Sequence, residues 1–213
     1  DNHHAEVMIK SNHPLTLPTT LTVENSDITI TITDKHQHLY HLHCASDIQE
    51  LVDNHGEMPL PPYMQRPANE ADKARYQTVY AAHPGAIAAP TAGLHFDAAL
   101  LEQLQARGVQ IAYVTLHVGS GTFASVREQD LSKHVMHTES RTLSPAVAEQ
   151  WRQTKANGGR VIAVGTTAVR TLESCWDGQT LVPQQGQTNL FITPGYTFHT
   201  VDALITNFHL PKS

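Results

Sequence analysis

The sequence is poor in cysteine and has no long apolar run, and each absence excludes a class of protein. Its 213 residues include two cysteines, Cys44 and Cys175, without CxxC spacing, which excludes a disulfide framework or a cysteine-based zinc finger. No run of about 18 apolar residues occurs, and no basic segment leads into an apolar one, which argues against a membrane span and a secretion signal. We therefore expect a cytoplasmic protein without a membrane partner.

Basic residues are also scarce, which at first argues against a nucleic-acid partner. The chain has 14 Lys and Arg against 20 Asp and Glu, a net charge of −6. The acidity is confined to residues 1–60, whose charge balance is −7, whereas residues 61–213 have a balance of +1. Residues 61–213 can therefore bind a polyanion if their Lys and Arg side chains cluster on one surface of the folded protein.

The front of the chain has the pattern of antiparallel strands. Apolar and polar residues alternate up to Cys44, with turn residues between the runs. Ser46 and Gln49 have capping-box spacing and predict a short helix that ends at Gly56. The proline-rich segment 58–63 then predicts a stiff connector. We expect residues 1–55 to form part of a small antiparallel β-barrel domain and residues 56–213 to form an α/β domain.

In the second domain, strands and helices are expected to alternate. Helices are predicted at 98–107, 146–157 and from residue 166, and strands at 85–93, 109–119, 160–165, 189–193 and 201–210. Asp97 and Ser144 are the expected N-terminal caps. This order predicts an α/β fold with a mainly parallel sheet and flanking helices.

Ligands of such sheets bind beyond the carboxyl ends of the strands, which points to four loops. The candidate residues there are Thr91, Gly93, His95 and Phe96; His117, Gly119, Gly121, Thr122 and Phe123; Gly165, Thr166, Thr167 and Arg170; and Asn207. The segment "GTTAVR" opens a helix, whose free N–H groups attract carboxylates and phosphates. Alternatively, Thr166 or Thr167 merely caps that helix. The segment "GSGT" lacks GxGxxG spacing, so no dinucleotide or methyltransferase-type cofactor is expected.

Histidines offer two further interpretations. His117 follows apolar strand residues and precedes a glycine-rich turn, which fits either proton transfer or a core position. His134, His137 and Glu139 lie close together in sequence, and on a helix they could share a metal ion. A metal-dependent hydrolase that uses these three residues is the alternative function, and a non-catalytic RNA-binding module is a second one.

Six ordered segments of residues 56–213 resemble one known family. They are "GEMPLPPY", "APTAGLHF", "TLHVGSGTF", "HVMHTE", "VIAVGTTAVRTLES" and "VDALITNFHLPKS", and they resemble the S-adenosylmethionine:tRNA ribosyltransferase-isomerases of queuosine biosynthesis. The resemblance implies an α/β domain interrupted by a small β-barrel, with residues 1–55 as its later part. It also implies that this chain is a fragment of a longer one. Ala168, Thr138 and Ser125 depart from the family pattern, but none of the three removes an ionisable group.

The resemblance also implies an activity and its partners. Such an enzyme transfers and isomerises the ribosyl moiety of S-adenosylmethionine onto 7-aminomethyl-7-deazaguanine at the tRNA wobble position. The products are epoxyqueuosine-tRNA, adenine and methionine. S-Adenosylmethionine is then a consumed cosubstrate and no cofactor is expected, and the tRNA anticodon loop is the macromolecular partner.

This reaction requires an acid, a base and an anion-binding group, and we assign them as hypotheses. His95 and His117 transfer protons, and Glu139 or His137 orients one of them. Thr166, Thr167 and the helix start hold the methionine carboxylate or a phosphate, with Arg170 as charge partner. Phe96 or Phe123 stacks on a base. Asp202 and Asn207 form hydrogen bonds to the ribose hydroxyls.

Overall fold

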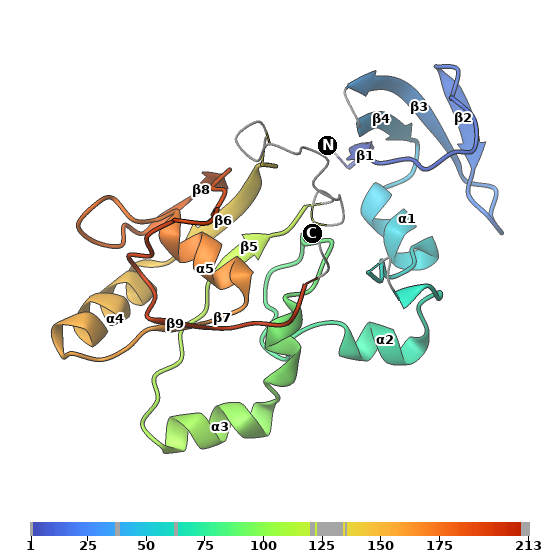
Figure 1. Cartoon of the computed structure of the whole chain (residues 1–213). Helices are drawn as coiled ribbons and strands as arrows, with labels where there is room; N and C mark the ends of the chain where they lie inside the picture. Colours follow the sequence, from blue (N-terminus) through green and yellow to red (C-terminus); the bar gives the residue numbers. More distant parts are fainter. Residues whose placement is uncertain are drawn as a thin grey trace. The chain divides into compact units, whose positions relative to one another are not determined.

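The computed structural model describes residues 2–36, 39–61, 64–119, 122, 134 and 136–209. Contacts divide the chain into two compact units, Asp1–Met58 and Pro59–Ser213, and both strands and helices are present (Figure 1). The predicted mixed α/β class is therefore confirmed, whereas the domains 1–55 and 56–213 stay a prediction, because compactness alone does not establish independent folding. Across the described ranges, every helix is too short or too polar to cross a bilayer.

The first unit is built on an antiparallel sheet, as the alternating sequence predicts. Its strands are β1 (His4–Val7), β2 (Thr19–Thr22), β3 (Thr29–His36) and β4 (Leu39–Cys44), in the order β1-β4-β3-β2. Ile32, Leu42 and Cys44 are its buried apolar residues. The order leaves β1 and β2 as edges, so the described strands do not close into the expected barrel.

Helix α1 (Ile48–His55) follows the sheet, but its cap differs from the predicted one. Asp47, not Ser46, is the N-cap, and its Oδ1 accepts from the amides of Gln49 at 2.7 Å and Glu50 at 3.2 Å. A carboxylate at this position satisfies two free amides and also interacts favourably with the helix dipole. The capping box predicted from Ser46 and Gln49 is therefore wrong.

The second unit contains two small sheets instead of one large parallel sheet. Strands β5 (Thr115–His117), β6 (Glu139–Leu143) and β8 (Gln184–Thr188) pair antiparallel in the order β5-β6-β8. Strands β7 (Ile162–Val164) and β9 (Ala203–Ile205) form a separate parallel pair. The prediction of a mainly parallel sheet is therefore wrong, because β6 and β8 are polar strands that interrupt the expected alternation of strands and helices.

The last three helices of this unit begin where the sequence predicts, whereas the two before them were not expected. They are α2 (Glu70–Arg75), the 3-10 helix η2 (Thr91–His95), α3 (Ala98–Ala106), α4 (Pro145–Ala156) and α5 (Thr166–Glu173). Asp97 caps α3 and Ser144 caps α4, which confirms both predicted caps. Residues 85–93 and 189–193, which were predicted as strands, form none in the structure.

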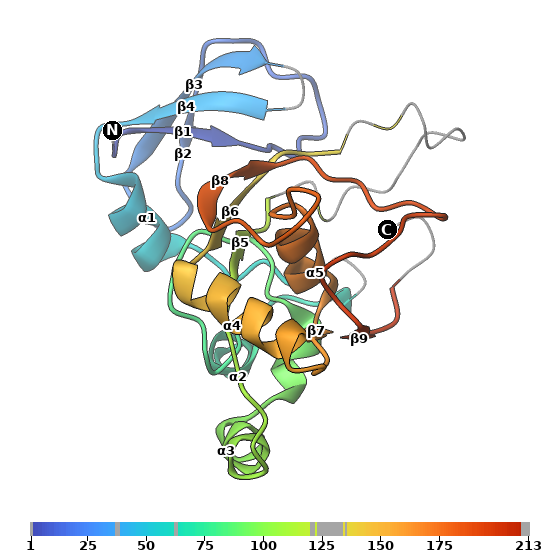
Figure 2. The ribbon, with the colours of Figure 1, turned by 90° about the vertical axis from the view of Figure 1, so that its left-hand side faces the viewer.

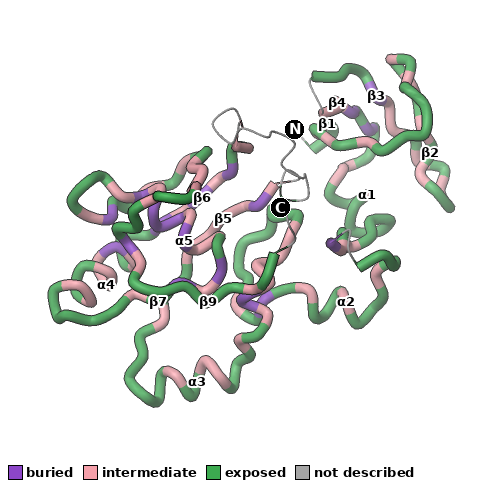
Figure 3. The backbone as a smooth tube through the Cα atoms, viewed as in Figure 1, coloured by how far each residue is buried: buried purple, intermediate pink, exposed green. Residues whose placement is uncertain are grey.

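Helix α5 is central to the second unit. It contacts β5, β6 and β7, and along the chain it follows β7 directly (Figure 2). Buried positions gather around α5 and β6 (Figure 3). The core cluster consists of Leu143, Ala148, Leu172, Cys175 and Leu181. Displacing α5 would therefore disturb both sheets of the unit.

Candidate functional site

The parallel pair β7–β9 brings two of the predicted loops to the same end of a sheet. Val164 is paired with Ile205, and the amide of Gly165 donates to the carbonyl of Ile205 at 2.9 Å. Gly165 has φ +88, and a Cβ there would meet Thr167 Oγ1 at 3.2 Å and Ala92 Cβ at 3.9 Å. The start of α5 therefore lies against η2. The sequence predicts that these two segments lie at the same end of a sheet.

The two threonines at the start of α5 do not cap it. The N-cap is Gly165, which has no side chain, and no side-chain hydrogen bond closes the first turn. Thr166 is exposed and Thr167 is half-buried. The alternative that these hydroxyls merely cap the helix is therefore wrong, and a first turn without a side-chain cap suits an anionic or hydroxylated ligand.

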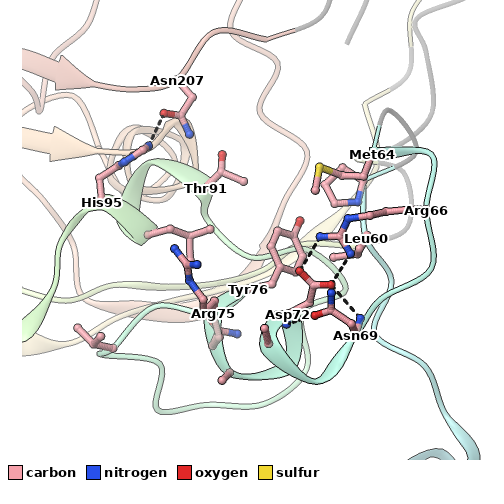
Figure 4. A pocket seen from close by; sticks show the side chains of 16 residues that line it. Leu60, Met64, Arg66, Asn69, Asp72, Arg75, Tyr76, Thr91, His95 and Asn207 are labelled. Atoms are coloured by element: carbon pink, nitrogen blue, oxygen red, sulfur yellow. Dashed lines mark hydrogen bonds and ion pairs between the residues drawn. The ribbon is translucent and has the colours of Figure 1, made fainter.

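A cavity of about 750 Å³ opens beside η2 (Figure 4). Thr91 and His95 of η2 line it together with Asn207, which follows β9, and His95 Nε2 lies 3.2 Å from Asn207 Oδ1. These are three of the residues that the sequence proposed for the site, from segments far apart in the chain. The volume lies within the range of small-molecule sites, roughly 300–1,000 Å³.

The opposite wall of the cavity comes from α2 and the residues on both sides of it, for which the sequence predicts no functional role. Arg66 binds Asp72 through two hydrogen bonds, of 2.6 and 2.8 Å, and Asn69 and Asp72 form a capping box. The sequence signal was the Asn-x-x-Asp spacing before an Arg in the last turn. This wall also contributes apolar and polar residues, namely Leu60, Pro61, Met64, Arg75, Tyr76, Gln77 and Val79.

The Arg66–Asp72 pair lowers the pKa of the Asp72 carboxyl group and so makes stability depend on pH in the acid range. The hydrogen bonds from Arg66, and then from the Asn69 amide, lower the pKa of Asp72 from 3.8 to about 2. A lowered pKa gives stability that is present above pH 3.8 and lost as the pH falls through about 2. We expect NMR titration of the Asp72 carboxyl carbon to give a midpoint near 2. Arg66→Gln should move that midpoint upward, and an unchanged midpoint would contradict the pairing.

A second group of predicted residues gathers on the side of α5. Glu139, at the start of β6, is 7% exposed, and it accepts from the Gly119 amide at 3.1 Å and from Arg170 Nη1. Arg170 Nη2 also donates to the carbonyls of His137 at 2.9 Å and Thr188 at 3.3 Å. Arg170 is thus already paired with a carboxylate, although we expected it to serve as a charge partner at the start of the helix.

His117 lies in β5 and does not line the cavity. It is half-buried, and its imidazole packs against Gly85, where a Cβ would come within 2.7 Å of Nδ1. Gly85 has φ +131, so only glycine fits this approach without strain. The structure therefore places His95 and His117 in different surroundings.

Asp202 lies at the other end of β9 from Asn207. Its carboxylate accepts from Lys155 Nζ at 2.7 and 2.9 Å and from the Val161 amide at 2.7 Å. The hydrogen bond from Lys155 lowers the pKa of Asp202, followed by that from Val161. Asp202 thus connects α4 to the beginning of the β7–β9 pair, away from the cavity.

The other candidates occupy varied positions. Gly93 is buried, and a Cβ there would lie 2.1 Å from Tyr80 Oη, while the half-buried Phe96 donates its amide to the Gly93 carbonyl at 3.0 Å. Thr122 is exposed and donates its amide to the Gly119 carbonyl at 3.2 Å. Gly121 and Phe123 lie outside the described residues.

The three residues of the metal hypothesis are not grouped as ligands. The described part of the chain contains no cluster of three His, Cys, Asp or Glu side chains placed to hold a metal ion. His134 packs on Phe191, with ring centroids 5.0 Å apart, and Glu139 is engaged by Arg170. The hypothesis required a helix, but residues 136–138 are irregular and Glu139 begins a strand, so the expected helical arrangement is wrong.

These features define a mixed α/β protein with a cavity of the size that small ligands occupy. Residues 1–213 match the family described as Queuosine biosynthesis protein. The chain belongs to this family.

Curated relatives agree with this assignment. The chain is 50% identical to the S-adenosylmethionine:tRNA ribosyltransferase-isomerase of Nitrosomonas europaea, over 100% of this chain and 61% of that protein. It is 50% identical to the protein of the same name from Francisella philomiragia, over 98% and 62%, and 52% identical to that from Thiobacillus denitrificans, over 88% and 54%. The chain thus spans 54–62% of the length of these relatives.

A solved structure is also similar to the chain. It is an S-adenosylmethionine tRNA ribosyltransferase from Thermotoga maritima, with 29% identity and a TM-score of 0.43. The match covers 88% of this chain and 49% of that one.

Proposed function

We propose that the cavity beside η2 binds S-adenosylmethionine as a consumed cosubstrate. The protein then transfers and isomerises its ribosyl moiety onto 7-aminomethyl-7-deazaguanine at the wobble position of tRNA. Adenine and methionine leave. Family membership supports the reaction, and the observation that carries the site is the meeting of Thr91, His95 and Asn207 at one cavity. The anticodon loop of tRNA is the proposed macromolecular partner.

His95 is the proposed proton-transfer group of the cavity. The reaction needs a base beside the sulfonium, an acid for the departing adenine and an unprotonated attacking amine. An imidazole can serve each of these needs near neutral pH. His95 is the histidine among the lining residues of the cavity, and its Nε2 lies 3.2 Å from Asn207 Oδ1. Thr91 and Asn207 supply the hydroxyl and amide groups for the nucleoside.

A comparison of two histidine variants tests this assignment. With S-adenosylmethionine and an anticodon stem-loop that carries the modified base, wild-type protein is expected to release adenine. Because His95 is the proposed proton-transfer group, we expect His95→Gln to slow release by about 10²–10⁴-fold. His117→Gln should slow release less, because His117 packs against Gly85 and does not line the cavity.

The two variants also provide the control for each other, since each removes one imidazole from the same unit. Circular dichroism should show that both remain folded. A larger loss of adenine release in His117→Gln than in His95→Gln would move the proposed chemistry from the cavity to β5. Binding of tRNA by wild-type protein without consumption of S-adenosylmethionine would instead favour a non-catalytic RNA-binding module.

A further inference from the structure

The two arginines of the cavity differ in their partners. Arg66 forms a bidentate pair with Asp72, so its charge is already balanced. Arg75 lies in the last turn of α2, and no carboxylate of the described ranges forms an ion pair with it. The cavity wall therefore carries one guanidinium that forms no ion pair within the described residues, and its charge acts on the Asp72 carboxylate only from a distance.

The position of Arg75 places this charge beside the other polar groups of the cavity. Figure 4 shows its side chain extending from α2 toward η2, which carries Thr91 and His95. Asn207 lines the same cavity and contacts His95. A ligand that reaches across the cavity from η2 and Asn207 to α2 would therefore meet Arg75.

We infer that Arg75 binds the amino-acid carboxylate of the nucleoside ligand, an inference that rests on the proposed function. S-Adenosylmethionine carries a sulfonium and an ammonium, both of which an unpaired guanidinium repels. Its carboxylate is the one anionic group that can offset this repulsion. A guanidinium matches a carboxylate through two parallel N–H donors, which a lysine cannot reproduce.

The pairing of Arg170 removes the residue to which the sequence gave this role. Arg170 donates to Glu139 and to two backbone carbonyls, and its side chain is 14% exposed. Binding of a carboxylate by Arg170 would require loss of the buried contact with Glu139, which is costly. Arg75 needs no such exchange, because it forms no ion pair with any carboxylate of the residues that the structure describes.

Calorimetric titration with two nucleosides tests the inference. S-Adenosylmethionine carries the carboxylate, whereas 5′-methylthioadenosine has the same nucleoside without the amino-acid end. Arg75→Gln is expected to weaken binding of S-adenosylmethionine by about tenfold or more and to leave 5′-methylthioadenosine unchanged. Arg75→Lys should give a smaller loss, because it keeps the charge but not the paired donors.

Lys73→Gln is the matched control, since it removes one positive charge from the same helix outside the cavity. Lys73 pairs with Glu70 at 2.9 Å on the surface and does not line the cavity. This variant should bind both nucleosides like wild type.

Each contrary outcome has a distinct meaning. Unchanged binding of S-adenosylmethionine by Arg75→Gln, with tight binding by wild type, would overturn the inference and leave the proposed function standing. Equal weakening of both nucleosides would assign Arg75 to the shape of the cavity and would also overturn it. Loss of affinity for the RNA stem-loop alone, with a smaller salt dependence, would identify a phosphate contact instead. Failure of wild type to bind either nucleoside would overturn the proposed function itself.

Discussion

Replacing Arg170 with Met is expected to lower the free energy of unfolding by about 3–5 kcal/mol. Glu139 is 7% exposed, so the substitution leaves its carboxylate buried without the guanidinium. The Gly119 amide then remains as a donor to this carboxylate. It also removes the donors to the carbonyls of His137 and Thr188. An unbalanced buried charge is far more costly than the loss of a surface pair. Urea unfolding followed by circular dichroism measures the effect.

A double-mutant cycle separates the ion pair from simple loss of packing. Glu139→Met together with Arg170→Met should be much more stable than the sum of the single effects predicts, because no charge then remains buried. Additive effects would show that the pair is not energetically coupled. Arg152→Met is the matched control, because Arg152 pairs with Glu149 at the surface with 61% of its side chain exposed. That variant should lose no more than about 1 kcal/mol.

The fold was predictable where a local signal was strong. Helices α3 and α4 are capped by Asp97 and Ser144, whose side chains accept from the amides three residues later. The sequence also predicts β7, β9 and the start of α5. Each strand is a short apolar run, and a turn of small residues separates β7 from α5. These elements depend mainly on neighbours in the sequence, so the sequence alone identifies them.

The antiparallel β5-β6-β8 sheet of the second unit could not be predicted, because buried positions of β6 are polar and β8 lacks apolar residues. In β6 the buried side chains are Glu139, Arg141 and Leu143, so charges occupy positions where a strand pattern requires apolar residues. Strand β8 has the sequence "QQGQT" and no apolar alternation at all. Burial of these charges depends on partners distant in the sequence: Arg170 for Glu139, and the Ser174 carbonyl for Arg141 at 3.1 Å.

The site was predictable in part. The convergence of Gly165, Asn207 and the η2 segment follows from a parallel strand pair, and the sequence suggested that pair. The α2 wall was not predictable, because Arg66 and Arg75 have no apolar period or motif that distinguishes them from surface cations. Their different roles emerge when Asp72 is seen to bind one of them. The catalytic and binding roles of all these residues stay predictions.

Replacing Glu173 with Ala is expected to have a comparably large effect on stability, about 3 kcal/mol or more. Glu173 is 4% exposed and accepts from the Thr200 amide at 2.9 Å, the Thr200 hydroxyl at 2.5 Å and the Tyr196 hydroxyl at 3.0 Å. It also accepts from the His199 amide at 3.2 Å. Thr200 is fully buried, so its donors would have no water to replace the carboxylate.

The loss should be localised to the segment that Glu173 holds. Limited proteolysis of Glu173→Ala is expected to cleave first between residues 193 and 200, because the carboxylate ties this segment to the end of α5. Glu149→Ala removes a carboxylate that lies at the surface and should retain the wild-type cleavage pattern and stability within about 1 kcal/mol. First cleavage elsewhere in Glu173→Ala would show that the carboxylate does not hold the segment.

The same contact predicts a change of stability at alkaline pH. Burial first, and then the hydrogen bond to Glu173 and its negative charge, raise the pKa of Tyr196 from 10.0 to about 12. A raised pKa gives stability that is complete below pH 10.0 and is lost as the pH rises through about 12. Between about pH 9 and about pH 11 wild type should therefore lose more stability than Tyr196→Phe.

Glu173→Gln should bring the pKa of Tyr196 back toward 10.0, because it removes the carboxylate's charge. Ultraviolet titration of the phenol measures this shift, and a phenol that still titrates near 12 in Glu173→Gln would assign the raised pKa to burial alone.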